Sequence, residues 1–144
     1  MGSIEQKLIE AQEKGNNLFK IIAERNIICS GKTEKEVNTE VYELAFELYG
    51  IKKYWHKRIV RAGKNTLFPY RENPPDLLIR QNYIVFLDFG PVFEDWEADF
   101  GRTFVLGNDH FMKKLQNDIM LAFDEGKAYF NSQTNITGGS YIIS

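Results

Sequence analysis

The sequence predicts an α+β protein in which two helices are followed by an antiparallel sheet and then by a third helix. Apolar residues recur at helical spacing near both ends of the chain, while the middle carries short runs rich in β-branched and aromatic residues. These runs lie too close together for parallel crossovers, which need a dozen or more residues. The strands are therefore expected to be antiparallel.

The first two elements are predicted helices. Residues 3–25 carry apolar side chains at helical spacing, and Gly15 is expected to weaken the middle of this helix by about 1 kcal/mol relative to Ala. The second helix is predicted to begin at Thr33, where Glu36 completes a capping box, and to end at Gly50.

The middle of the chain changes to strand patterning. Four runs are predicted to be extended: residues 58–61, 67–70, 83–89 and 97–106. Asn108 or Asp109 then caps a third helix with one apolar face. Because no linker, repeat or low-complexity stretch forces a division, residues 1–144 are expected to form a single domain.

Composition excludes some function classes and favours a compartment. The net charge is −2 with acids and bases interleaved, so no basic face is expected for nucleic acid. The longest apolar run is too short to cross a bilayer, so no membrane partner is expected. The single cysteine, Cys29, cannot form an internal disulfide, and no export signal opens the chain; we expect a cytoplasmic protein.

Two aspartates are the candidate chemical groups. Asp88 ends an apolar strand, where an ionised carboxylate is costly unless a metal, an arginine or backbone donors compensate it. Asp99 follows eleven positions later. A hairpin turning near residues 93–94 would place the two side chains opposite one another, with Cβ atoms within about 5.5 Å. A divalent cation between them, or a structural ion pair with Arg102 or Arg61, would relieve the repulsion.

The residues around these aspartates resemble a known signature. Asp88-Phe89-Gly90 followed by Asp99-Phe100-Gly101-Arg102-Thr103 is similar to that of the pita-bread metallopeptidases, the family of methionine aminopeptidase, prolidase, aminopeptidase P and creatinase. The strand and glycine–asparagine turn at residues 60–66 also resemble this family. The resemblance covers residues 55–107 well, and it implies the N-terminal half of the pita-bread catalytic domain.

The resemblance implies metal ligands and an incomplete site. Asp88 would chelate one ion and Asp99 would bridge two, with manganese, cobalt or zinc activating a water molecule. The family's remaining ligands, a His and two Glu, belong to a second half that this chain does not contain. We therefore expect no complete catalytic set, weak or absent metal binding by this chain alone, and truncation after about residue 131.

Substrate contacts are also expected near the aspartates. Tyr70 stands where the family carries an upstream His, and His56 could occupy the substrate side of the pocket or be a hydrogen-bonded structural residue. Trp55, Phe93 and Trp96 could join Tyr70 in lining an apolar peptide pocket or could belong to the core.

The expected function is hydrolysis of an N-terminal peptide bond, as in aminopeptidases and Xaa-Pro peptidases. The expected partners are a peptide substrate together with a second copy of the chain or a missing C-terminal half. A non-catalytic peptide- or protein-binding module of the same fold is the alternative, and metal content would distinguish the two. The third possibility is an unrelated α+β protein in which the aspartate pair is an accident.

Overall fold

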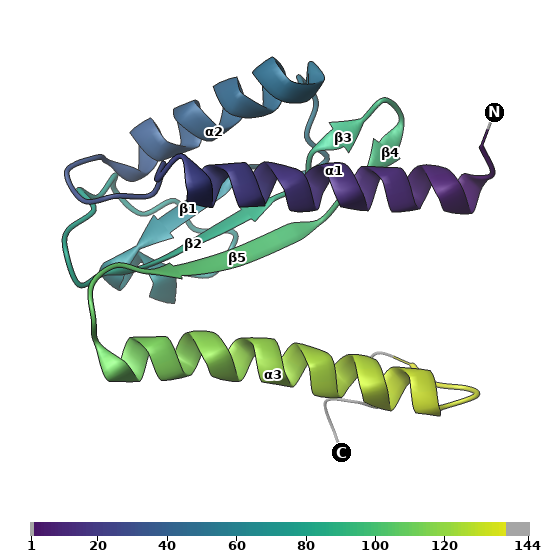
Figure 1. The fold of residues 1–144 in the computed structure, drawn as a ribbon. Helices are drawn as coiled ribbons and strands as arrows, with labels where there is room; N and C mark the ends of the chain where they lie inside the picture. The colour runs from purple at the N-terminus through teal and green to yellow at the C-terminus, as the bar shows by residue number, and fades with distance from the viewer. Residues whose placement is uncertain (1, 138–144) are drawn as a thin grey trace. The chain divides into compact units, whose positions relative to one another are not determined.

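The computed structural model describes residues 2–137 and confirms the predicted α+β order. Its elements are α1 (Ile4–Glu24), α2 (Glu34–Tyr49), β1 (Ile59–Ala62), the 3-10 helix η1 (Gly63–Leu67), β2 (Ile84–Phe89), β3 (Val92–Phe93), β4 (Trp96–Glu97), β5 (Phe100–Val105) and α3 (His110–Ser132) (Figure 1). Within the described residues, no helix is long and apolar enough to span a bilayer.

The chain divides into two compact units, Met1–Gly107 and Asn108–Ser144. Of the described elements, the first unit holds both N-terminal helices and the five strands, and the second holds α3. The single-domain organisation stays a prediction. So does truncation after about residue 131, and residues 138–144 lie outside the described part of the chain.

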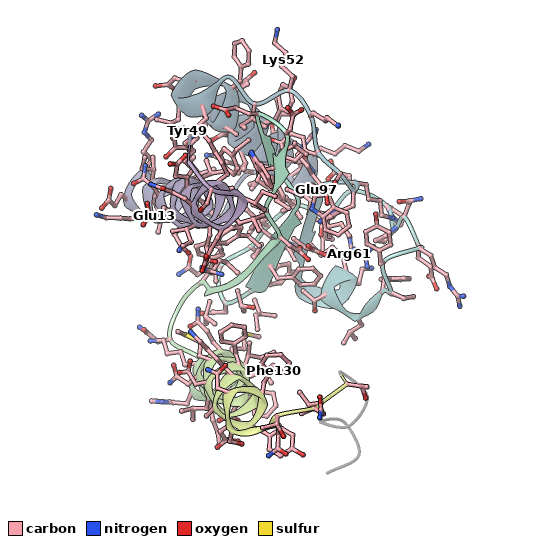
Figure 2. All side chains as sticks on the ribbon, turned by 90° about the vertical axis from the view of Figure 1, so that its right-hand side faces the viewer. Glu13, Tyr49, Lys52, Arg61, Glu97 and Phe130 are labelled. Carbon is pink, nitrogen blue, oxygen red and sulfur yellow. The ribbon has the colours of Figure 1, made fainter. Side chains whose placement is uncertain are left out.

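The sheet in the first unit packs one face against α1 and α2. Its order is β1-β2-β5, all antiparallel, and β3 pairs with β4 in a short ribbon. Along β2, Val85, Leu87 and Phe89 are buried in the core shared with α1 and α2, and Phe89 packs edge-on against Phe19 of α1. The alternate residues, which include Asp88, are half-buried on the other face. The core side chains fill the space between the helices and the sheet (Figure 2).

The helix ends follow the predicted caps. At α2 the Thr33 hydroxyl accepts from the Glu36 N–H at 3.2 Å, and the Glu36 carboxylate accepts from the Thr33 N–H at 2.7 Å. Gly50 ends the helix in the left-handed conformation, with φ of 66°. At α3 it is Asp109 that caps, since its carboxylate accepts from the Met112 N–H.

The strand predicted at residues 67–70 is wrong. Residues 63–67 form η1, and the chain then turns away from the sheet. The reason lies in Arg61 (labelled in Figure 2), which is buried and donates hydrogen bonds to the carbonyl oxygens of Phe68, Pro69 and Glu72. In a strand, successive carbonyls point to opposite sides, so carbonyls that converge on one guanidinium are not arranged to pair with a neighbouring strand.

Gly15 is a packing requirement rather than a weak point of α1. A Cβ atom there would lie 2.2 Å from Cε2 of Phe100, which belongs to β5. Gly15→Ala is therefore expected to lower the free energy of unfolding by about 1–3 kcal/mol, although Ala favours the helix by about 1 kcal/mol. Urea denaturation measures this.

Gln12→Ala, at an exposed position of the same helix, is the control and should change stability by less than about 0.5 kcal/mol. A Gly15→Ala protein more stable than the wild type would show that Phe100 repacks without cost.

Candidate metal centre

The hairpin between β2 and β5 places the two aspartates on one face, but not directly opposite each other. Phe93 pairs with Trp96, so Glu94 and Asp95 form the turn, and Glu94 takes a φ of 59°. The turn is centred one residue later than expected. Because an antiparallel partner shifts by two residues when the turn shifts by one, Asp88 pairs with Gly101. The predicted direct opposition of Asp88 and Asp99 is therefore wrong.

Asp99 instead lies diagonally across from Asp88. It stands two residues before Gly101, and side chains two residues apart in extended chain point to the same face. The diagonal spacing still lets the two carboxylates approach a common point.

Asp88 is less enclosed than its apolar neighbours in sequence imply. Its side chain is 38% exposed, because alternation along β2 turns it away from the helices. Burial still raises the pKa of the Asp88 carboxyl; His56 opposes this rise, and Asp99 adds to it. The residual cost of ionising Asp88 favours a nearby cation.

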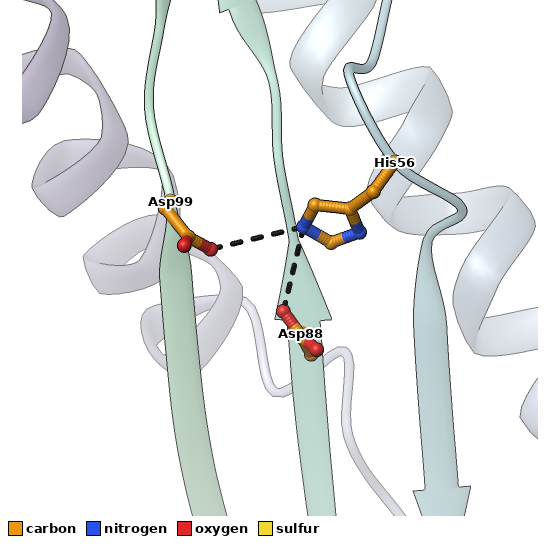
Figure 3. Close-up of side chains that lie close together, drawn as sticks. All are labelled: His56, Asp88 and Asp99. Carbon is orange, nitrogen blue, oxygen red and sulfur yellow. Dashed lines mark ion pairs between the residues drawn. The ribbon is translucent and has the colours of Figure 1, made fainter. Parts of the chain in front are cut away.

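His56 completes a group of three side chains. It comes from the loop before β1, and its Nε2 atom lies 3.5 Å from Oδ1 of Asp88 and 3.7 Å from Oδ1 of Asp99 (Figure 3). One nitrogen and two carboxylate oxygens lie within 4.8 Å of one another. Nitrogen and oxygen donors at this spacing fit a divalent cation of the manganese, cobalt or zinc type.

The arginines offered as alternative partners are occupied elsewhere. Arg61 binds the carbonyls described above, while Arg102 donates to Gly101 O and to Oδ1 of Asn16. Within the described residues, the ion pairs found for Asp88 and Asp99 are with His56. The structural ion pair with an arginine is thus not what compensates these carboxylates.

Comparison with known proteins identifies the family. The model of metallopeptidase family M24 matches residues 6–131 of this chain. The chain belongs to this family. The resemblance to pita-bread metallopeptidases is confirmed.

Three similar proteins show how much of a longer protein the chain represents. An uncharacterized peptidase of Methanocaldococcus jannaschii is 35% identical over 85 residues, which are 59% of this chain and 23% of that protein. An Xaa-Pro dipeptidase of Pyrococcus horikoshii is 27% identical over 110 residues, 76% of this chain and 30% of that protein. The solved Xaa-Pro dipeptidase of Bacillus anthracis shares the fold, with a TM-score of 0.74 and 24% identity over 88% of this chain and 35% of that chain. The chain thus spans about a quarter to a third of these relatives.

Tyr70 lies beside the group formed by His56, Asp88 and Asp99. Its ring is 6.1 Å from that of His56, and its hydroxyl accepts from the Lys57 N–H at 3.3 Å. The Trp55 ring also packs edge to face against the His56 ring, with centroids 4.3 Å apart, and its indole N–H donates to Ala98 O at 2.9 Å. Tyr70 and Trp55 are both exposed.

Phe93 and Trp96 do not share this position. Phe93 is buried in the core and Trp96 packs against it. Of the four aromatic residues considered for a peptide pocket, these two are core residues.

The approach of His56 to both aspartates could have been found from strand register. Ile59 pairs with Asp88, so the residues before β1 run alongside the end of β2. The Trp55 N–H indeed donates to Gly90 O at 3.0 Å. Sequence reasoning placed β1 correctly but did not extend its register backwards to His56.

Proposed function

We propose that this chain carries part of an M24 peptidase site in which Asp88 and Asp99 hold a divalent cation. The observation that carries the proposal is the convergence of both carboxylates with an imidazole nitrogen. A cation bound there would activate water and polarise a carbonyl group. The proposed reaction is hydrolysis of an N-terminal peptide bond. Similarity to an Xaa-Pro dipeptidase supports substrates with proline in the second position.

Asp88 and Asp99 differ in exposure, and we assign them different roles. Asp88 is held within a six-residue strand, so its side chain provides a fixed ligand. Asp99 stands just before β5 with 69% of its side chain exposed, and it therefore faces the side from which a peptide would arrive. The exposed rings of Trp55 and Tyr70 offer apolar contact to the substrate.

The remaining catalytic groups are proposed to come from elsewhere. The family resemblance implies a His and two Glu from a second half, one of the Glu acting in proton transfer, a role that contributes about 10²–10⁴-fold. A separate C-terminal half, or a second copy of the chain, is the proposed partner that completes the site. The 144-residue chain alone is expected to show no useful peptidase activity.

A peptidase assay tests this proposal. The purified chain, and the same chain continued by an M24 second half, are incubated with Ala-Pro and Ala-Ala dipeptides plus manganese, cobalt or zinc. We expect cleavage only by the continued chain, and loss of that cleavage in Asp88→Asn. His110→Ala, which changes the first residue of α3, is the control and should retain activity.

Two outcomes would contradict the proposal. Robust cleavage by the 144-residue chain would show that it needs no completion. A continued chain that binds peptides but neither holds metal nor cleaves them would support the non-catalytic binding module instead.

A further inference from the structure

His56 is held in place more firmly than a surface histidine. Its side chain is only 10% exposed, and its ring packs edge to face against those of Trp55 and Tyr70, with centroid distances of 4.3 and 6.1 Å. Gly90 makes room for it, because a Cβ atom there would lie 2.6 Å from Cδ2 of His56. The imidazole is thus aimed at the aspartates by packing.

A backbone contact determines which ring nitrogen carries the proton. Nδ1 of His56 lies 2.7 Å from the carbonyl oxygen of Lys57. A carbonyl oxygen only accepts hydrogen bonds, so Nδ1 must donate its proton there. In the neutral ring Nε2 is then left with a lone pair, which is the form that binds metals. A carbonyl on the second nitrogen is the usual support of a ligating histidine.

Nε2 therefore faces the carboxylates of Asp88 and Asp99, which when ionised can only accept hydrogen bonds. An oxygen of each carboxylate points at it, and a cation between the three converging lone pairs would relieve their mutual repulsion. A proton on Nε2 would also let the ring bind the two carboxylates, by donating hydrogen bonds to them. Charge-assisted N–H···O bonds are about 2.7–2.9 Å long, however, and Nε2 lies 3.5 and 3.7 Å from the two carboxylate oxygens. Two ligands about 2.1 Å from one tetrahedral ion are about 3.4 Å apart. The spacing suits shared coordination better than direct hydrogen bonding.

We propose that His56 is a third ligand, with Asp88 and Asp99, of a single divalent cation held by this chain on its own. The inference rests on the proposed function, since it adds a ligand to the same site. His56 is not part of the two short motifs that begin at Asp88 and Asp99, and the sequence left it either a substrate contact or a hydrogen-bonded structural residue. An imidazole shifts the preference from magnesium toward zinc and cobalt. Binding should consequently be tighter than two carboxylates alone would give.

Metal titration and spectroscopy test the third ligand. Calorimetric titration of the 144-residue chain with zinc, cobalt and magnesium chlorides is compared with titration of His56→Ala, Asp88→Asn and His110→Ala. We expect His56→Ala to weaken zinc and cobalt binding by at least about tenfold and to affect magnesium less. Asp88→Asn should weaken binding of all three ions, and His110→Ala should leave them unchanged.

Pulsed electron paramagnetic resonance of the manganese-loaded wild type gives a readout that does not depend on folding of a variant. Coupling from an imidazole nitrogen is expected in the wild type and in His110→Ala. Circular dichroism checks that His56→Ala is folded before its affinity is interpreted.

The outcomes separate this inference from the proposed function. If Asp88→Asn loses the metal while His56→Ala binds like the wild type, or if manganese shows no nitrogen coupling, the two-carboxylate site stands and His56 is not a ligand. If the wild type binds none of these ions, the inference is overturned; if a chain continued by an M24 second half also binds none, the proposed function falls with it.

Discussion

Replacing Glu34 with Gln is expected to lower the free energy of unfolding by about 2–4 kcal/mol. Glu34 is buried, and its carboxylate accepts from the Ala62 N–H at 2.7 Å, the Asn65 side-chain amide at 2.9 Å and the Leu77 N–H at 3.2 Å. A glutamine keeps one accepting oxygen and turns an NH₂ donor toward another donor. Hydrogen bonds to a charged group contribute about 1.5–3 kcal/mol each, and an unmet buried donor costs about 1–3 kcal/mol.

The electrostatics of Glu34 show why all three donors matter. Burial raises the pKa of its carboxyl, and the bonds from Ala62, Asn65 and Leu77 lower it without cancelling that rise, so they offset part of the cost of burial. Urea denaturation followed by circular dichroism measures the loss. Glu43→Gln, an exposed position of the same helix, is the matched control and should change stability by less than about 0.5 kcal/mol. Equal effects of the two substitutions would show that the buried donors find other acceptors.

Glu34 also bears on the candidate metal centre. Glu34 is the first residue of α2, and its hydrogen bonds connect this helix to the end of β1, to η1 and to the segment before β2. β1 in turn pairs with β2 at Asp88, and the loop before β1 carries His56. A loosened Glu34 network is therefore expected to disturb the aim of His56 as well as overall stability.

The parts of the fold that sequence predicted are those determined by local chemistry. The caps at Thr33 and Asp109 act within one helical turn, and their residue types alone indicate where the helices begin. The strand at β2 follows from a continuous β-branched and aromatic run. The motif around Asp88 and Asp99 was recognisable because it is contiguous in sequence.

The parts that sequence reasoning missed depend on contacts between distant residues. The segment at residues 67–70 has strand-like composition, but its carbonyls turn toward Arg61. From sequence alone Gly15 is a residue that weakens a helix; in the structure, the Phe100 ring fills the space that a side chain at position 15 would need. A turn displaced by one residue, set by the unusual φ of Glu94, changes the partner of Asp88.

Gly90→Ala is expected to be the most damaging small substitution at the candidate metal centre. A Cβ atom at this position would lie 2.4 Å from Nε1 of Trp55 and 2.6 Å from Cδ2 of His56, closer than non-bonded atoms approach. Both rings would have to move, and the hydrogen bond from Trp55 to Ala98 O would be lost or lengthened. Forcing atoms into a packed site costs about 1–3 kcal/mol, and the broken hydrogen bond adds about 1 kcal/mol.

The same movement turns the His56 ring away from Asp88 and Asp99, so zinc affinity should fall by at least about tenfold, as for His56→Ala. Gly101→Ala is the matched control, because its Cβ would meet only Leu87 O, at 3.8 Å, which is ordinary contact. Thermal unfolding and zinc calorimetry on both variants measure the two effects. Because the clash involves Trp55 and His56 together, a Gly90→Ala protein with wild-type stability and zinc affinity would mean that the loop before β1 adapts freely. In that case His56 would not be held in the position on which its assignment as a ligand depends.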